Sequence, residues 1–327
     1  MEQLVDALKA IGEPTRLRIV VALESCELTV NEICTVLGQS QPRVSRHLRL
    51  LTEAGLLHRH AEGTSAYYGL RHYAEGRGLY DAVAHLIDRT EPVLQRDQER
   101  LNTVRAARAE QAATYFSEVA EKWDAVREMH VANTDVETAM LDAVAEPIVD
   151  RLLDIGTGTG RILELFADRT RVGLGIDSSR QMLSVARARV DEDHLSHVTV
   201  RHGDLFDLDV DPGSQNVVVL HHVLHFLTNP ERAIEVAAKV LSPGGTLLVV
   251  DFAEHGLEVL RTEHAHSHLG FTERQVARWC STAGLKPSTA QHFLPPTHGD
   301  DGLTVTLWSA TKPTKAAKRT NAEKVST

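Results

Sequence analysis

Uninterrupted apolar runs in the second half of the chain constrain its fold more than any other feature. The runs are RLLDIG, VGLGID, VTVRHGD, VVVLHH and TLLVVDF, and amphipathic segments separate them. A strand that is apolar at consecutive positions buries both of its faces, which is typical of a parallel sheet covered by helices on both sides. The pattern therefore predicts a doubly wound α/β domain over residues 113–310.

The first part of the chain has a different pattern. Helical segments are expected at residues 2–11, 15–25 and 29–37, and Gly38 ends the third. Ser40 is suited to cap a further helix from Gln41 to Glu53, in which Pro42 occupies the first turn. The strand-like runs LLHRH and SAYYGL then flank the turn AEGT. Helices followed by a small hairpin predict an α+β winged helix-turn-helix domain over residues 1–95.

The helix from Gln41 to Glu53 has two chemically distinct faces, because residues advance about 100° each. Val44, Leu48 and Leu51 share one stripe, and arginines spaced three apart occupy the opposite face. An apolar face that packs and a basic face that meets phosphates and base edges suit a helix in the major groove. We therefore expect contacts to double-stranded DNA from Gln41, Arg43, Ser45, Arg46, His47, Arg49 and, in the hairpin, Arg59.

Charge by itself leaves an alternative for this helix. A basic face is more often simply solvated, and the formal net charge of the chain is -10. Between Gln39 and His60, however, four arginines stand against the single acid Glu53. Because the local patch sets phosphate affinity, the helix-turn-helix context favours DNA binding over a solvated face.

The segments EPTRLRIVVAL, ELTVNEICTVLGQSQPRVSRHLRLLTEAGLL and RHAEGTSAYYGL, in this order, resemble the ArsR/SmtB regulators. The resemblance covers roughly the first 75 residues and implies a homodimer that binds a palindromic operator and represses transcription. Many members sense metal through two cysteines in the pattern Glu-Leu-Cys-Val-Cys-Asp. Thr29 and Asn31 replace both thiols in this chain, so the thiolate site cannot form.

Other metal sites receive little support from the sequence. Asp81 and His85 are isolated and do not supply the spacing that some members use for zinc. Cys26 and Cys34 are two thiols without further ligands, and packing in the core is the more common role of such residues. We therefore expect no metal cofactor.

A glycine-rich turn, LLDIGTGTG at residues 152–160, follows the first apolar run. Its Gly-x-Gly-x-Gly spacing differs from the Gly-x-Gly-x-x-Gly fingerprint of dinucleotide-binding proteins. Asp177 ends the next run, where a carboxylate can accept hydrogen bonds from both hydroxyls of a ribose. Asp204 closes the third run within HGDLF.

Together these features resemble class I S-adenosylmethionine-dependent methyltransferases, over roughly residues 112–308 and including SPGGTLLVVDF. The resemblance implies a Rossmann-like domain that binds S-adenosylmethionine or S-adenosylhomocysteine. The expected ligand-binding residues are Tyr115, Trp123, Asp154, Gly156, Thr157, Gly158, Gly160, Asp177, Ser178, Met182, Asp204, Leu205 and His221.

The same resemblance assigns a role to each part of this set. The glycine turn would hold the methionyl part, with Asp154 organising the loop, and Asp177 would bind the ribose. Asp204 would meet the adenine amino group, with Leu205 and Met182 against the ring, and His221 would line the pocket. The aromatic side chains of Tyr115 and Trp123 would close over the ligand.

Two histidine runs raise the question of catalysis. His221, His222 and His225 follow the fourth apolar run, and a later HAHSH run spans residues 264–268. Neither run shows a supporting carboxylate, so surface or packing roles are favoured over metal binding. No catalytic residue is assigned. Methylation of arsenic needs several thiols near the cofactor. Because Cys280 is the only cysteine in this half, we do not expect that activity.

The segment between the two domains is predicted to be helical. Leu79, Val83, Leu86 and Ile87 fall on one helical face, which suits core packing, a dimer helix or both. Residues 96–112 carry little apolar surface and are predicted to be a helical linker, and residues 311–327 a basic disordered tail.

We further expect a cytoplasmic protein with no membrane partner. No apolar run is long enough to span a bilayer, and MEQLVDALKA lacks the apolar core of a signal peptide. Three cysteines form no disulfide framework, which fits a reducing compartment.

Two functions remain open. The fusion resembles S-adenosylhomocysteine-responsive ArsR-type regulators of methionine-cycle genes, which predicts a repressor with an adenosyl effector. The alternative is an active methyltransferase that acts on a small molecule and carries a DNA-binding domain. An intact cofactor signature is compatible with both.

Overall fold

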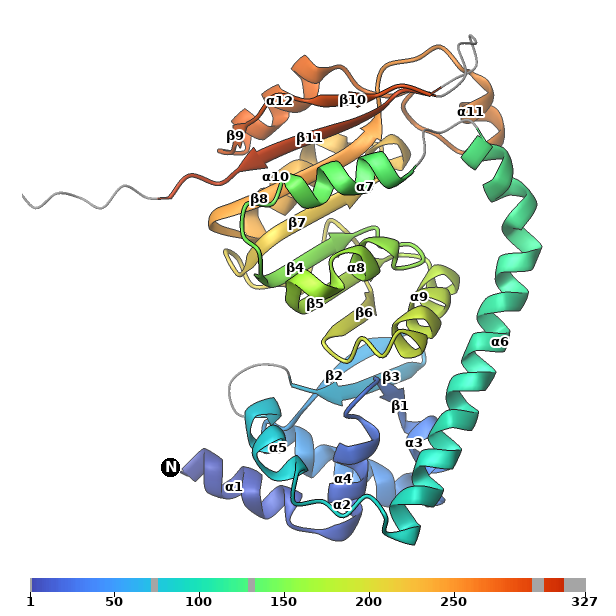
Figure 1. Ribbon diagram of the computed structural model, residues 1–327, viewed down its shortest axis with the longest axis vertical. Helices are drawn as coiled ribbons and strands as arrows, with labels where there is room; N and C mark the ends of the chain where they lie inside the picture. Colours follow the sequence, from blue (N-terminus) through green and yellow to red (C-terminus); the bar gives the residue numbers. More distant parts are fainter. Residues whose placement is uncertain (1, 72–75, 129–132, 296–302, 315–327) are drawn as a thin grey trace, which may run out of the picture.

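The computed structural model describes residues 2–71, 76–128, 133–295 and 303–314, and the predicted tail lies almost wholly outside them. Two domains lie at opposite ends of a long helix, α6 (Pro92–Glu128) (Figure 1). None of the helices in these ranges combines the length and the apolar character that a membrane span requires.

The N-terminal domain is a winged helix-turn-helix, as predicted. Its helices are α1 (Glu2–Ile11), α2 (Pro14–Ala22), α3 (Val30–Leu37), α4 (Gln41–Glu53) and α5 (Gly76–Ala84). Its small antiparallel sheet has the order β1-β3-β2, formed by β1 (Leu28–Thr29), β2 (Leu57–Glu62) and β3 (Ser65–Leu70). Ser40 is the N-cap residue of α4, but its side chain makes no capping hydrogen bond.

The second domain is built on a sheet of order β10-β11-β8-β7-β4-β5-β6. Its strands are β4 (Val149–Ile155), β5 (Thr170–Asp177), β6 (Val198–His202), β7 (Gln215–His221), β8 (Leu241–Phe252), β9 (Lys286–Pro287), β10 (Gln291–Phe293) and β11 (Val305–Thr311). The strands from β6 to β8 are parallel, and β11 is antiparallel to β8. This arrangement confirms the doubly wound fold.

Helices cover both faces of this sheet. They are α7 (Asn133–Asp142), α8 (Arg161–Leu165), α9 (Arg180–Glu192), α10 (Pro230–Val240), α11 (Val259–Glu263) and α12 (Glu273–Thr282), with the 3-10 helices η1 (Ala167–Arg169) and η2 (Leu224–Phe226). Alternate residues of each strand enter two different cores: Leu152 packs with Met140 of α7, whereas Leu153 packs with Ile234 of α10. Burial on both faces therefore explains the uninterrupted apolar runs.

The helix α6 is more than a linker. Leu101 is 2% exposed and packs into the core of the winged domain, together with Val104. Residues 96–112 were expected to carry little apolar surface, and these two side chains join the core of the winged domain rather than form a core of their own. The linker bounds stay a prediction. Further along, α6 packs against α9 of the second domain.

The predicted face with Leu79 and Val83 belongs in part to the same core. Both side chains are partly buried against it, as is Ile87, and Tyr80 between them is fully buried. Leu86 remains 73% exposed. Core packing is thus confirmed for three of the four residues, and dimerisation stays a prediction.

Candidate functional site

The glycine turn lies at the carboxyl ends of the central strands, where ligands bind in open α/β sheets. Gly156, Gly158 and Gly160 all have positive φ. At Gly156 a Cβ would lie 2.4 Å from the Cγ2 of Val223, whereas at Gly158 it would meet no atom within 4 Å. Gly156 is therefore required by packing, and the backbone at Gly158 is left open to a ligand.

The carboxylate of Asp177, at the end of β5, is fixed beside this turn. One oxygen accepts a hydrogen bond from the Gly158 N–H at 2.8 Å, and the other accepts one from the Ser179 N–H at 2.7 Å. The strand and the turn thus present this side chain together, half-buried, where the sequence analysis expected a ribose contact.

Asp154, at the end of β4, is fully buried below the turn. Neither of its oxygens has a hydrogen-bond partner among the described residues. Burial, together with the nearby charge of Asp177, raises the pKa of Asp154 to about 7. Two carboxyl groups thus lie close to one glycine turn, that of Asp154 buried and that of Asp177 half-buried.

The remaining predicted ligand residues surround the same strand ends. Asp204, just after β6, is exposed and accepts a hydrogen bond from the Phe206 N–H at 2.8 Å. Met182 lies in the first turn of α9, and Leu205 is 9% exposed. Burial lowers the pKa of His221, at the end of β7, to about 4, so its ring is neutral at pH 7.

Some expected residues cannot be placed against this pocket. Tyr115 and Trp123 lie within α6, but their side chains are outside the described residues. Ser178 is exposed between β5 and α9, and Thr157 is buried within the turn. The ligand-binding roles of the whole set stay predictions.

Histidines gather next to this pocket, at the ends of β7 and β8. His225 is 2% exposed, and its Nδ1 lies 2.7 Å from the Oδ1 of Asp251. The rings of His225 and His266 lie 4.1 Å apart, and His222 joins His225 and Asp251 in a group whose ligand atoms lie within 4.8 Å of one another. Asp251, the next-to-last residue of the apolar run TLLVVDF, supports His225. The expectation that no carboxylate supports these histidines was therefore wrong.

Backbone strain accompanies this histidine group. His222 and Ala265, which immediately precedes His266, both have positive φ, a conformation that non-glycine residues rarely adopt. Such strain persists only where the surrounding structure holds it, and it is common at functional sites.

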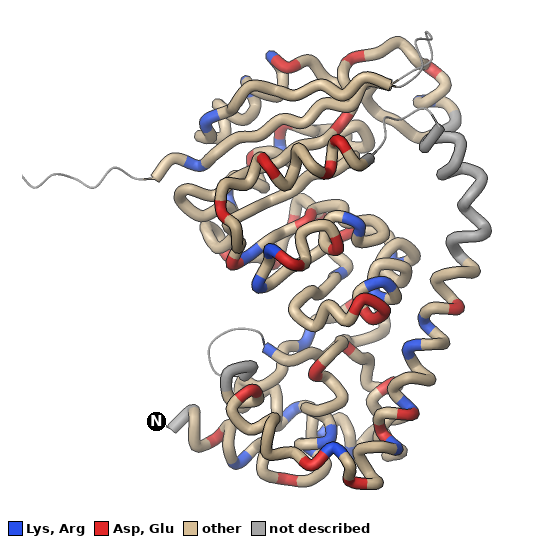
Figure 2. Tube along the Cα trace, viewed as in Figure 1, with Lys and Arg blue, Asp and Glu red and all other residues tan. Residues whose placement is uncertain are grey.

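The face predicted to bind DNA is well formed. Val44, Leu48 and Leu51 of α4 are fully buried. On the other side of the helix the residues Gln41, Arg43, Ser45, Arg46 and Arg49 are exposed, and so is Arg59 of β2. Figure 2 shows basic and acidic residues mixed among the helices of the winged domain. His47 is only half-buried, and its Nδ1 lies 3.5 Å from the Oε2 of Glu13.

At the positions of the family's metal cysteines the structure holds a capping box. Thr29 caps α3, and its N–H donates to the Oε2 of Glu32 at 2.7 Å. Burial raises the pKa of the Cys26 thiol to about 11, so this cysteine stays protonated at pH 7. The predicted absence of any metal cofactor is a separate matter and stays a prediction.

Buried ion pairs join α9 to the winged domain. Arg187 pairs with Glu62 at the end of β2, and its guanidinium lies 4.0 Å from the centre of the Tyr67 ring. One helical turn later, Asp191 accepts a hydrogen bond at 3.0 Å from Arg108 of α6, which also binds Glu32. Sequence reasoning missed these pairs because no local pattern relates their members.

The wing itself touches the start of α9. A Cβ at Gly63, in the turn between β2 and β3, would lie 2.6 Å from the guanidinium carbon of Arg180. Arg180 is the first residue of α9 and follows Asp177 by three positions. The end of β5 with Asp177 and the wing turn with Gly63 therefore both lie next to the first turn of α9.

Comparison with known proteins separates the chain into the same two parts. Residues 153–249 match the family described as "Methyltransferase domain", and residues 13–59 match "Bacterial regulatory protein, arsR family". The arsenical resistance operon repressor of Escherichia coli is 46% identical over 67 residues, which are 20% of this chain and 57% of the repressor.

Other relatives are less similar. A phosphatidylethanolamine N-methyltransferase of Cereibacter sphaeroides is 35% identical over 102 residues, which are 31% of this chain and 50% of that enzyme. An uncharacterized 37.1 kDa protein in transposon TN4556 of Streptomyces fradiae is 32% identical over 180 residues, 49% of this chain and 51% of that protein. The chain spans about half the length of these curated relatives.

Proposed function

Because the chain joins an ArsR-family helix-turn-helix domain to a class I methyltransferase domain, we propose that it is a transcriptional repressor whose effector is an adenosyl compound. The second domain would bind S-adenosylmethionine or S-adenosylhomocysteine. The bound ligand would then change the affinity of the first domain for operator DNA.

The observation that carries this proposal is the position of α9. Its first turn lies next to Asp177 and the wing turn at Gly63, and its last turns are tied to the winged domain through Arg187 and Asp191. A ligand that orders Asp177 and Ser179 would therefore act on a helix that pairs with the wing through Arg187 and lies directly above the winged domain in Figure 1. Coupling requires that the ligand binds one arrangement more tightly than the other, typically by about 1–3 kcal/mol.

The ends of β4 and β5 support an adenosyl effector by their chemistry. The fixed carboxylate of Asp177 favours a ligand that donates hydrogen bonds or carries positive charge. The open backbone at Gly158 permits close approach. When bound, S-adenosylmethionine supplies an activated methyl group, whereas S-adenosylhomocysteine lacks it and acts only as a signal.

The DNA-binding part of the proposal includes a homodimer. Three apolar side chains of α1, those of Leu4, Val5 and Leu8, are between 42% and 50% exposed, and Leu86 is more exposed still. Exposed apolar groups in one region of a regulator support association with a second copy. Two copies would present two α4 helices to a palindromic operator.

The target genes follow from the nature of the effector. A repressor that reads the level of an adenosyl compound suits genes whose products make or consume it. We therefore propose genes of the methionine cycle as targets.

Calorimetry with both adenosyl compounds tests the proposal. Operator DNA is first selected from a random-sequence library with the full chain, and each compound is titrated with and without that DNA. We expect binding of at least one compound and a change of about 5- to 150-fold in its affinity when DNA is present. Equal affinities in both titrations would exclude an effector role.

A second function is favoured by the pair His225–Asp251. A buried carboxylate that orients an imidazole is a common arrangement for a general base, and this pair lies beside the predicted ligand pocket. His225 would accept a proton from a substrate while the methyl group is transferred. Incubation with methyl-labelled S-adenosylmethionine and cell extract tests this function: label transfer that is lost in His225→Gln would establish an enzyme.

A further inference from the structure

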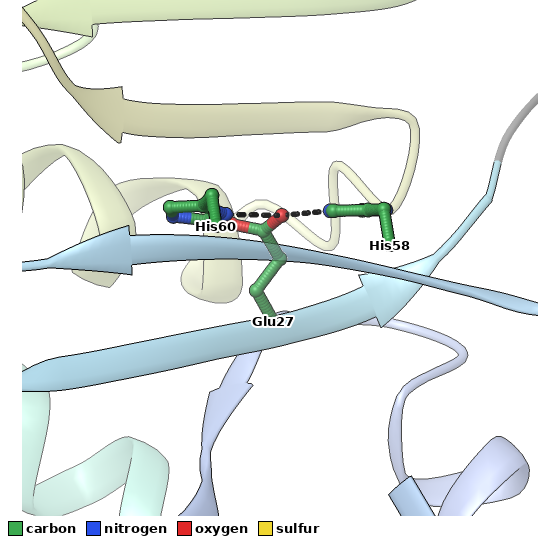
Figure 3. Close-up of side chains that lie close together, drawn as sticks. All are labelled: Glu27, His58 and His60. Atoms are coloured by element: carbon green, nitrogen blue, oxygen red, sulfur yellow. Dashed lines mark hydrogen bonds and ion pairs between the residues drawn. The ribbon is translucent and has the colours of Figure 1, made fainter. Parts of the chain in front are cut away.

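Three side chains converge on the inner face of the wing, at the joint between the two domains (Figure 3). His58 and His60 lie two positions apart on β2 and therefore leave the strand on the same face. Glu27, just before β1, reaches between them: its Oε1 lies 2.5 Å from the Nε2 of His58 and 3.7 Å from the Nδ1 of His60.

The neighbouring strand shapes this group. At Gly69 of β3 a Cβ would lie 2.7 Å from the Cε1 of His58 and 2.9 Å from the Cγ of Glu27, so only glycine permits this approach. The ring of Tyr67 stacks on His60 with centres 5.4 Å apart. The three side chains are thus held by packing and are between 9% and 15% exposed.

Hydrogen bonding explains only part of the arrangement. The bond between Glu27 and His58 satisfies those two groups. Both ring nitrogens of His60 are buried, and neither has a hydrogen-bond partner among the described residues. A buried imidazole without a partner is costly, unless the site has an occupant that the polypeptide does not provide.

The donor set identifies the class of that occupant. One carboxylate oxygen and two imidazole nitrogens form a familiar set of three protein ligands for zinc, with a fourth position for water. One ligand atom from each residue lies within 4.8 Å of the other two. Against the expectation of no metal cofactor, we propose that Glu27, His58 and His60 bind one divalent transition-metal ion of the zinc type.

A bound ion would replace the hydrogen bond between Glu27 and His58, because the Nε2 of His58 must give up the proton that it donates before it can bind a metal. The unpartnered ring nitrogens of His60 need no such exchange. The positive charge of Arg201 also acts on Glu27 and His60, so we expect weaker binding than at a site without that arginine.

This site is separate from the thiolate site of the ArsR family and from the predicted adenosyl pocket. Its surroundings include residues of both domains, because a small cavity next to Glu27 and His58 is also lined by Ser196, Val198 and Thr199. A bound ion would link β2 to the segment before β1. It would thereby stiffen the face of the wing that contacts β6.

Zinc titration of the full chain, stripped of metal and monitored by competition with a chromophoric chelator, tests the site. We expect zinc to bind and to raise the melting temperature, because it binds only the folded site. His60→Ala should bind one ion fewer, or bind it at least about 10–100-fold more weakly, which is the usual cost of losing even an outer-shell partner. The exposed His85, on the same domain, provides the matched control, and His85→Ala should bind zinc as the wild type does.

Two further measurements keep the result interpretable. Glu27→Gln retains the shape of the carboxylate and should also lose the ion, which covers the case that His60→Ala does not fold. Cobalt in place of zinc should give the spectrum of nitrogen and oxygen ligands, without a thiolate charge-transfer band from Cys26. Wild-type zinc binding in folded His60→Ala and Glu27→Gln, no binding by the wild type, or a thiolate band would each overturn the proposal.

Discussion

Arg187 of the methyltransferase domain and Glu62 of the wing form a buried ion pair, with Nη1 and Oε1 3.1 Å apart. The two side chains are only 8% and 6% exposed. A charge left alone in such a place is expensive, so each partner depends on the other. The pair makes the position of the wing sensitive to the position of α9.

Loss of either partner should therefore destabilise the protein. We expect Arg187→Met to lower the free energy of unfolding by about 3–5 kcal/mol, because Glu62 stays buried without its partner. Urea denaturation measures the change, and the double variant with Glu62→Leu should recover much of it. The exposed pair Arg171–Asp150 is the control, since Arg171→Ala should cost at most about 1 kcal/mol. Additive single effects in the double variant would contradict the interpretation.

Operator binding should depend on the exposed face of α4. Arg46→Ala should weaken binding to all DNA sequences and reduce the slope of affinity against salt by about 1, because one phosphate contact is lost. Ser45→Ala or Gln41→Ala should instead relax sequence preference. Fluorescence anisotropy over a range of salt concentrations separates the two effects. An unchanged salt slope in Arg46→Ala would remove that arginine from the interface.

The adenosyl pocket should depend on Asp177. Asp177→Asn keeps the size of the side chain but removes its charge, and charge-assisted hydrogen bonds contribute about 1.5–3 kcal/mol each. Affinity for S-adenosylmethionine and S-adenosylhomocysteine should fall by a similar factor of about 10–100, since their ribose is identical. Calorimetry measures both. Operator affinity without ligand should stay at the wild-type value, and a retained ligand response would show that another site is the switch.

Stability should depend on pH through Asp154. Its pKa is about 7 in the folded protein and near the ordinary 3.8 in the unfolded chain, so the folded state holds the proton over the interval between them. Stability without ligand should therefore fall as pH rises from about 4 to about 7. Asp154→Asn lacks this titration. The free energy of unfolding of the variant minus that of the wild type should therefore be larger at pH 8 than at pH 4. Parallel stability profiles from denaturation at each pH would refute this role for Asp154.

The sequence by itself determined the features that depend on local patterns. Helical periodicity placed Val44, Leu48 and Leu51 in the core and predicted the bounds of α4 as the structure has them. Continuous apolar runs predicted a sheet covered on both faces. Glycine spacing predicted the turn between β4 and α8. Each of these follows from neighbours within one helix or strand, where geometry is set by sequence distance.

Only the tertiary structure decided which distant residues meet. Glu27 and His58 are 31 positions apart, and Glu62 and Arg187 are 125 apart. The partner of His225 could not be predicted from the sequence, because Asp251 lies on β8, the strand next to β7. Strand order, domain packing and the path of α6 bring these groups together. Such contacts depend on which distant segments the tertiary fold places side by side. The local periodicity of a helix or strand contains no information about that.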